Sequence, residues 1–211
     1  MKYYPVFWDI TEKKCIVIGG GDVAARKVER LLSCGARVCV VSPELVPELA
    51  ALQKEGRLDY IADRYAGKYL DGATLVIGAT DDEQTNAAIS RDARAIGIPV
   101  NIVDDPQKCD FILPSLVERG DLTLACGTGG ASPALARHVR EELEKIFGEE
   151  YGALLSILSQ LRMKMEKNQG LGRVWFDRLM AADLLGAIRD KDEARVKSIV
   201  LEITGSEVNL D

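Results

Sequence analysis

Residues 15–27, "CIVIGGGDVAARK", pass from four apolar residues through three glycines straight into a helix-like segment. Gly19, Gly21 and Ala24 match the pattern G-x-G-x-x-A. In such a turn the first glycine permits the tight bend, and the second removes the Cβ that would block a pyrophosphate. The small third residue lets the helix approach the strand, and the free N–H groups of the helix face the phosphates. The stretch predicts a dinucleotide-binding turn; the alternative is a packing turn without a ligand.

Short runs rich in Val and Ile alternate with helical patterns around this turn. The strand-like runs cover residues 14–18, 37–41, 74–79 and 98–103, and residues 58–62 form a weaker candidate. An apolar stripe of Ala24, Val28, Leu31 and Leu32 marks a helix between the first two, and residues 82–97 form another. Strands that alternate with helices predict a doubly wound parallel α/β sheet.

The pattern changes after residue 112. "FILPSLVERGDLTLACGTGG" (111–130) holds two strand-like pieces around a Gly-Asp turn, and a helix follows with Ser132 at its N-cap and Pro133 in its first position. Helical patterns then cover residues 151–168, 174–188 and 191–204. We therefore expect a Rossmann-like domain over 1–112, a β-β-α dimerisation unit over 113–147 and a helical C-terminal domain over 148–211. A strand pair too small to bury itself is a candidate for pairing with a second subunit, which predicts a homodimer.

The composition narrows the class of protein. Lys and Arg total 27 and Asp and Glu total 33, which gives a net charge of -6. This charge argues against binding of nucleic acid that is driven mainly by electrostatic attraction. The five cysteines are odd in number, which argues against a disulfide framework and predicts a reducing compartment. No two of them form a C-x-x-C pair, so we expect no zinc site. The start "MKYYPVFWDI" lacks a signal-peptide pattern, and no apolar run approaches the length of a membrane span. These features predict a cytoplasmic protein without membrane or nucleic-acid partners.

The end of the second strand is where an acidic residue usually binds the cofactor ribose. Here the sequence reads "VVSPEL", with Ser42 at that position and Glu44 two residues later. This stretch contains no arginine that could bind the 2′-phosphate of NADP, which favours NAD over NADP. The residues predicted to bind the cofactor are Gly19, Gly21, Asp22, Val23, Ser42, Pro43, Glu44 and Thr80.

Acidic pairs follow two of the predicted strands. Asp81 and Asp82 follow the run at 74–79, and Asp104 and Asp105 follow the run at 98–103. In open α/β sheets ligands bind outside the carboxyl ends of the strands. Clustered carboxylates beside an apolar pocket raise one another's pKa, which suits a proton acceptor near neutral pH.

Most of these acids have a simpler structural role. Helix N-capping is favoured for at least one of Asp81 and Asp82, and an Asp-Pro turn for Asp105. Asp104 is the first residue past the predicted strand and is the predicted catalytic residue. Asn101 and Thr80 are expected to point into the same crevice, with Asn101 binding substrate.

A second glycine run, "CGTGGASPALAR" (126–137), precedes a capped helix N-terminus. It predicts an anion-binding nest for the substrate, made by Thr128, Gly129, Ser132 and Arg137; the alternative is a flexible hinge. Arg26 and Lys27 add cations after the first glycine loop, although such residues usually form a solvated face. The single histidine, His138, is expected to be structural rather than a catalytic base.

Four motifs together resemble one family. "PVFWDITEKKCIVIGGGDVAARKVERLL", "ATDD…N", "NIVDDP…DFILPS" and "GTGGASPALAR" occur in the order and spacing of the N-terminal module of siroheme synthases. That module is a precorrin-2 dehydrogenase, often with sirohydrochlorin ferrochelatase activity. The resemblance covers about residues 3–145 strongly and the helical tail loosely. It implies an NAD-binding Rossmann domain, an interlocked dimerisation unit and a small helical domain.

The resemblance also implies a reaction. Precorrin-2 would give two electrons as a hydride to NAD+, forming sirohydrochlorin, and Fe²⁺ would then enter as a substrate with release of two pyrrole protons. The family's aspartate in its N-x-V-D run falls on Asp104, which implies a proton acceptor there. The basic and N–H-rich loops would bind the eight carboxylates of this substrate. No methyltransferase domain is attached, so a separate uroporphyrinogen methyltransferase is expected to supply precorrin-2.

The sequence departs from the family in one loop and leaves other functions open. Relatives often read S-S-G-G-T-S-P, whereas this chain keeps a hydroxyl at Thr128 and loses the one at Ala131. Nothing resembles a dedicated iron site, so a dehydrogenase without chelatase activity is one alternative. Others are a non-enzymatic NAD sensor, a dehydrogenase of small hydroxy or amino acids, and a chelatase alone, which would leave the glycine loop unexplained.

Overall fold

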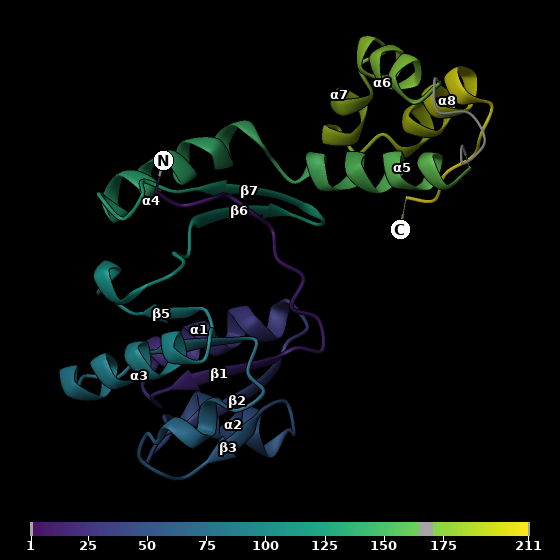
Figure 1. Cartoon of the computed structure of the whole chain (residues 1–211). Coiled ribbons are helices and arrows are strands. Elements are labelled where there is room, and N and C mark those ends of the chain that lie inside the picture. Colours follow the sequence, from purple (N-terminus) through teal and green to yellow (C-terminus); the bar gives the residue numbers. More distant parts are fainter. Residues whose placement is uncertain (1, 165–170, 211) are drawn as a thin grey trace. The chain divides into compact units, whose positions relative to one another are not determined.

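Five parallel strands form the central sheet of the first part of the chain (Figure 1). In a computed structural model, residues 2–164 and 171–210 are described. The strand order is β3-β2-β1-β4-β5. The bounds are β1 (Lys14–Ile18), β2 (Arg37–Val41), β3 (Asp59–Ile61), β4 (Leu75–Gly78) and β5 (Val100–Ile102). All five strand-like runs of the sequence are therefore confirmed, and β1 lies at the centre with β2 and β4 on its two sides.

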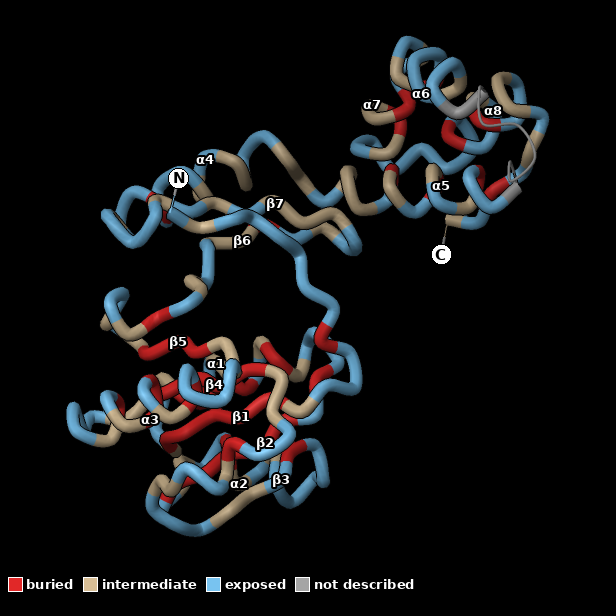
Figure 2. Tube along the Cα trace, viewed as in Figure 1, coloured by how far each residue is buried: buried red, intermediate tan, exposed pale blue. Residues whose placement is uncertain are grey.

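Helices cover both faces of this sheet. They are α1 (Asp22–Ser33), α2 (Pro47–Lys54) and α3 (Glu83–Ala95), with short 3-10 turns η1 (Gly67–Leu70) and η2 (Pro106–Lys108). Val17 packs on one face with α1 and α2, whereas Ile16 packs on the other with α3. Neighbouring strand residues point to opposite faces, so the buried residues run continuously along the strands (Figure 2). This is the doubly wound arrangement that the alternation predicted, although α2 was not predicted.

An antiparallel hairpin begins the second part of the chain. β6 (Ser115–Arg119) pairs with β7 (Leu122–Cys126) around Gly120, whose φ of +56° lies in the left-handed region. α4 (Pro133–Ile146) packs against both strands. The Ser132 Oγ accepts a hydrogen bond from the Leu135 N–H at 3.2 Å, and Pro133 starts the helix, so the predicted cap is confirmed.

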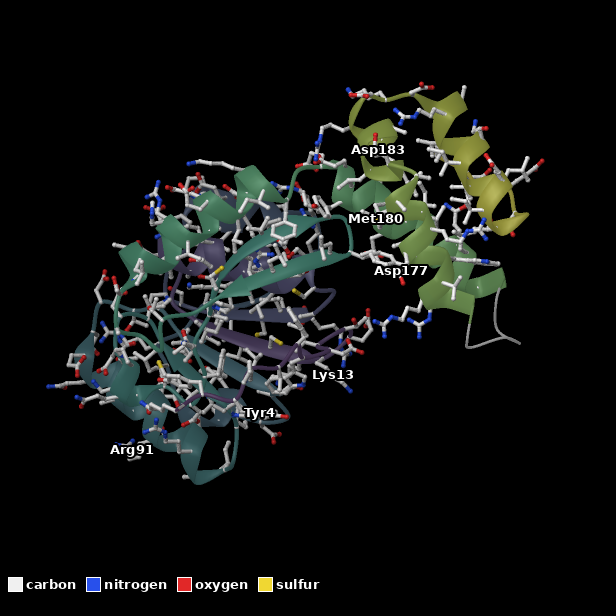
Figure 3. All side chains as sticks on the ribbon, turned by 90° about the horizontal axis from the view of Figure 1, so that it is seen from above. Tyr4, Lys13, Arg91, Asp177, Met180 and Asp183 are labelled. Atoms are coloured by element: carbon white, nitrogen blue, oxygen red, sulfur yellow. The ribbon has the colours of Figure 1, made fainter. Side chains whose placement is uncertain are left out.

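Four more helices pack around a core of their own. They are α5 (Glu150–Lys164), α6 (Leu171–Ala181), α7 (Leu184–Arg189) and α8 (Glu193–Thr204), with Ile157, Leu179 and Val200 in the core. The predicted helix over 151–168 corresponds to α5, and its last residues lie outside the described ones. The single helix predicted over 174–188 is wrong, because the chain turns at Asp183. Asp183 has a φ of +58°, and its N–H donates to the Met180 carbonyl at 3.1 Å (Figure 3).

The chain forms two compact units, Met1–Leu113 and Pro114–Asp211. The predicted fold class is confirmed: a Rossmann-like parallel sheet, then a β-β-α unit, then a helical C-terminal region. The division at 112, and the separation of 113–147 from 148–211, stay predictions, as does pairing with a second copy. None of the described helices is long and apolar enough to cross a membrane.

Candidate functional site

The first two glycines of the loop after β1 are fixed by neighbouring backbone. A Cβ at Gly19 would lie 2.2 Å from the Ala79 carbonyl oxygen, and Gly19 has a φ of +124°. A Cβ at Gly20 would lie 1.9 Å from the Glu44 carbonyl oxygen. The loop therefore packs between the backbone of Ala79, after β4, and that of Glu44, after β2. Only glycine fits at these two positions.

Gly21 has a different environment, because no atom lies within 4 Å of the Cβ that another residue would place there. It is the N-cap of α1, and no side chain caps the helix. The Ala25 N–H donates to the Gly21 carbonyl, so the N–H groups of Asp22 and Val23 belong to the first turn, which has no intrahelical partners. An open approach to an uncapped helix N-terminus fits a pyrophosphate, which needs close backbone contact and N–H donors.

The backbone of the loop after β2 lies against the glycine loop at Gly20. Ser42 is buried, with 8% of its surface exposed. Its Oγ would lie 2.7 Å from a Cβ placed at Gly20. The Tyr60 hydroxyl donates to the Ser42 carbonyl at 3.0 Å and lies 3.2 Å from that of Pro43. Glu44 is exposed, so its carboxylate is more accessible to a ribose hydroxyl than the Ser42 hydroxyl is. The ribose contacts of all three residues stay predictions.

The turn after β4 uses most of its polar groups internally. The Thr80 hydroxyl donates to the Asn86 Oδ1 at 2.9 Å, and the Asn86 amide donates to the Thr80 carbonyl. Asp82 caps α3 by accepting from the N–H groups of Gln84 and Thr85, which confirms the capping interpretation. Hydrogen bonds from Thr85, its hydroxyl first, lower the pKa of the Asp82 carboxyl. Thr80 therefore stabilises the turn, and its contact with a cofactor stays a prediction.

Asp104 stands out by its backbone. β5 ends at Ile102, so Asp104 is the second residue past the strand rather than the first. It is exposed and has a φ of +62°, a left-handed conformation that is uncommon for a residue with a Cβ. Such conformations cluster at functional sites, where surrounding contacts hold them in place.

A lysine from α1 shares the electrostatic environment of Asp104. Lys27 is half-buried, and burial, followed by the charge of Arg26, lowers its pKa. The charge of Asp104 acts in the opposite direction on the pKa of Lys27. The sequence placed Lys27 six residues after Gly21 but gave no signal of this electrostatic effect.

The residues around Asp104 are tightly connected. The Asn101 amide donates to the Phe111 carbonyl at 2.9 Å, so Asn101 is held inside the fold, and its predicted substrate contact stays a prediction. Asp105 accepts from the Gln107 N–H at 3.1 Å and pairs with Lys108, which also pairs with Glu83 of α3. The turn role of Asp105 is thereby confirmed, and Lys108 is the first cause of its lowered pKa.

The second glycine run lies in the second unit and is held by its own hydroxyls. The Thr128 Oγ1 accepts from the Ser132 N–H and donates to the Ser132 carbonyl, both at 3.1 Å. Gly129 has a φ of +65°, and no atom lies within 4 Å of a Cβ placed there. The Arg137 Nε donates to Glu141 at 2.8 Å. Their substrate contacts stay predictions, and His138 is exposed on α4.

The described residues contain no group of three or more His, Cys, Asp or Glu side chains that could hold a metal ion. All five cysteines are free thiols. Burial raises the pKa of Cys15 to about 11 and also raises that of Cys109.

Comparison with known proteins places this site in a family. A family described as "Putative NAD(P)-binding" matches residues 6–115, and one described as "Sirohaem biosynthesis protein central" matches residues 119–146. The siroheme synthase of Methylobacillus flagellatus is 43% identical over 173 residues, covering 82% of this chain and 37% of the relative. Siroheme synthase 1 of Aeromonas salmonicida is 39% identical over 203 residues, covering 94% and 43%. The chain thus spans about two fifths of the length of these curated relatives.

A solved structure shares the fold along nearly the whole chain. The structure of "SirC, precorrin-2 dehydrogenase" has a TM-score of 0.73 and 23% sequence identity, and the match covers 97% of this chain and all of that one. The four motifs in the sequence resemble the N-terminal module of siroheme synthases, and the curated relatives carry that name. Because its match spans more than half of the residues, this chain belongs to the family described as "Putative NAD(P)-binding".

Proposed function

We propose that this chain oxidises precorrin-2 to sirohydrochlorin and passes a hydride to NAD+. The observation that carries the proposal is the uncapped, open glycine loop at Gly21 in the same unit as the exposed, left-handed Asp104. The names of the curated relatives and of the solved structure with the same fold support the substrate. The oxidation removes one hydride and one proton from precorrin-2, so it needs a hydride acceptor and a proton acceptor.

The residues of the chain divide this work. The cofactor, when bound, accepts the hydride. The N–H groups after Gly21 hold its pyrophosphate, and the exposed Glu44 carboxylate accepts a hydrogen bond from a ribose hydroxyl. Asp104 accepts the proton from the substrate. Lys27 places a positive charge beside that carboxylate, which also attracts a substrate that carries eight carboxylates.

NAD is the proposed cofactor rather than NADP. An exposed carboxylate at Glu44, close to the glycine loop, would repel the 2′-phosphate of NADP and accept from the free 2′-hydroxyl of NAD. Asn101 is proposed to contact the substrate. Separately, the run with Thr128, Gly129, Ser132 and Arg137 is proposed to bind carboxylates. Gly129 supports this assignment because open space lies in front of its backbone.

Insertion of Fe²⁺ into sirohydrochlorin is proposed as a second reaction of the chain. The support is the name of the relatives, since siroheme contains iron, together with an exposed carboxylate at Asp104 that can collect the two pyrrole protons. Fe²⁺ is a substrate in this proposal. A chain that performs only the first reaction would form sirohydrochlorin and leave added Fe²⁺ free.

We also propose that the second unit binds a second copy of this chain. Leu135, Val139 and Ile146 of α4 expose 52%, 39% and 60% of their surfaces, and they form an apolar stripe. The hairpin beneath α4 has only two strands, so each strand has an edge without a partner in its sheet. An exposed apolar stripe beside open strand edges is the surface that a symmetric dimer covers.

The test is an anaerobic assay without metal, in which precorrin-2 and NAD+ are mixed with the purified chain or with Asp104→Asn. Absorbance follows sirohydrochlorin and NADH together. We expect both products with the wild-type chain and at least a hundredfold slower formation with Asp104→Asn, at unchanged NAD+ affinity, since a general base contributes about 10²–10⁴-fold.

Each outcome of this assay distinguishes the proposed function from one of the alternative functions. Equal turnover of Asp104→Asn would remove Asp104 from the mechanism. Tight NAD+ binding without turnover of precorrin-2 would support a sensor, and turnover of small hydroxy or amino acids would support an ordinary dehydrogenase. Addition of Fe²⁺ after the first reaction then tests the second, because siroheme and sirohydrochlorin absorb differently.

A further inference from the structure

The turn that carries Asp104 closes on a buried thiol. Cys109 exposes 7% of its surface, and its Sγ lies 3.1 Å from the carbonyl oxygens of both Ile102 and Asp105. The Ile102 N–H donates to the same sulfur at 3.2 Å, and the Asn101 amide does so at 3.5 Å. One side chain therefore connects the end of β5 to Asp105, the residue directly after Asp104.

These contacts bracket Asp104. The two carbonyl groups that face the thiol belong to Ile102, two residues before Asp104, and to Asp105, directly after it. The Asp105 N–H also donates to the Ile102 carbonyl at 3.3 Å. A left-handed backbone at a residue with a Cβ persists only where the surroundings impose it. Cys109 contacts the backbone on both sides of Asp104 from inside the protein.

A second set of contacts holds the turn from outside. Asp105 accepts from the Gln107 N–H and pairs with Lys108, which reaches Glu83 on α3. Asp105 and Lys108 are both part-buried, whereas Glu83 is exposed. The contacts of Cys109 act on the same turn from its buried side.

We propose that Cys109 is a positioning residue that fixes the left-handed turn at Asp104 and so aims its carboxylate for proton transfer. This inference rests on the proposed role of Asp104 as proton acceptor. Cys109 itself is buried and stays a thiol, which keeps a hydrogen on the sulfur for donation to a carbonyl. The alternative is that Cys109 is an ordinary buried apolar residue.

Cys39 provides a matched control for that alternative. It also exposes 7% of its surface and belongs to the same core cluster, but it lies on β2, away from the Asp104 turn. Cys39→Ala and Cys109→Ala remove the same atom at the same depth. Cys109→Ser keeps a group that donates and accepts, whereas Cys109→Val fills the space without any hydrogen bond.

The experiment compares these four variants with wild type and Asp104→Asn in the anaerobic assay at saturating substrates. We expect Cys109→Ala and Cys109→Val to lower kcat by about ten- to a hundredfold, as a misplaced catalytic group does, while the Kd for NAD+ stays unchanged. Cys109→Ser should recover most of kcat, and Cys39→Ala should keep all of it. Amide exchange at Ile102, followed by NMR, should accelerate in Cys109→Ala but not in Cys39→Ala.

The outcomes separate the two levels of inference. If Asp104→Asn is inactive while Cys109→Ala is as active as Cys39→Ala, the positioning role of Cys109 is wrong and the proposed reaction stands. If Asp104→Asn keeps full turnover, the proposed role of Asp104 fails first. If Cys109→Ala does not fold, Cys109→Val and Cys109→Ser carry the same comparison, and equal kcat in these two would overturn the proposal.

Discussion

Three consecutive glycines in the loop after β1 are glycine for different physical reasons. At Gly19 and Gly20 a Cβ would strike the backbone of Ala79 and of Glu44, so these two residues serve the fold. At Gly21 a Cβ would meet nothing within 4 Å, so the fold alone does not require glycine there. We proposed that the cofactor pyrophosphate approaches the backbone here, which would account for a glycine at this position.

Gly21→Ala should therefore separate binding from stability. We expect its NAD+ affinity to fall at least about tenfold, because the new methyl group lies where the pyrophosphate approaches, while its free energy of unfolding stays within about 1 kcal/mol of wild type. Gly19→Ala should instead lose about 3 kcal/mol or more of stability, through a steric clash and a strained φ. Titration calorimetry and urea unfolding measure the two effects; unchanged NAD+ affinity of Gly21→Ala would refute the reading of the loop.

Glu44 is the residue proposed to choose between the two nicotinamide cofactors. Loss of its charge in Glu44→Gln should weaken NAD+ binding about tenfold, since hydrogen bonds to charged groups contribute about 1.5–3 kcal/mol. Binding of NADP+ should become tighter, because repulsion of the 2′-phosphate is removed. Glu48→Gln, an exposed substitution on α2, is the control and should change neither Kd. A parallel change for both cofactors would contradict the proposed contact.

At the residue scale the sequence predicted local motifs better than contacts between residues that are far apart in the chain. It identified the glycine loop, the capping group at Asp82 and the turn residue Asp105, because short motifs carry their own local geometry. It did not reveal the influence of the Asp104 charge on Lys27 or the contacts of Cys109 with the turn. These depend on which elements the fold brings together, and no local pattern encodes them.

At the scale of elements, the turn between β5 and the first unit's last residues is stabilised by charge. Lys108 lowers the pKa of Asp105 below its ordinary value of 3.8. A carboxyl whose folded-state pKa is lowered contributes stability above that ordinary value, and the contribution is lost as the pH falls through the folded-state pKa. Asp105→Asn should therefore be less stable than wild type at neutral pH, and the difference should shrink below pH 3.8. Urea unfolding across this range measures it; a difference independent of pH would contradict the assignment.

The apolar stripe of α4 is the element proposed to hold two copies together. Val139→Glu places a charge in the middle of the stripe and should weaken the dimer at least about thirtyfold, which corresponds to about 2 kcal/mol. His138→Glu adds the same charge at the neighbouring exposed position, off the stripe, and should weaken it far less. Sedimentation velocity over a range of concentrations measures both. A wild-type chain that remains monomeric at high concentration would refute the proposed interface.

The elements themselves were predicted where periodicity is strong. Every strand of the sheet and the hairpin was found, because buried Val- and Ile-rich runs are distinctive. α2 was missed although Pro47 marks its start, since its apolar residues form only a weak stripe. The break between α6 and α7 was missed because Asp183 adopts a left-handed conformation that few non-glycine residues take.

At the scale of the molecule, each unit contributes a different part of the account. The first unit, Met1–Leu113, contains the glycine loop, Glu44, Lys27 and Asp104, which are the groups proposed to bind a dinucleotide and to accept a proton. The second unit, Pro114–Asp211, contains the apolar stripe of α4 and the second glycine run. The oxidation of precorrin-2 is therefore expected to depend on NAD+ bound in the first unit.

The central claim is tested most directly by a single turnover under anaerobic conditions, with the chain in excess over precorrin-2, NAD+ present and metal excluded. The amounts of NADH and sirohydrochlorin are determined after the reaction is complete. The account predicts one NADH for each sirohydrochlorin with wild type, and the same ratio at a lower rate with Gly21→Ala at an NAD+ concentration below its Kd. Sirohydrochlorin formed without NADH, or no reaction by a chain that is saturated with NAD+, would contradict it.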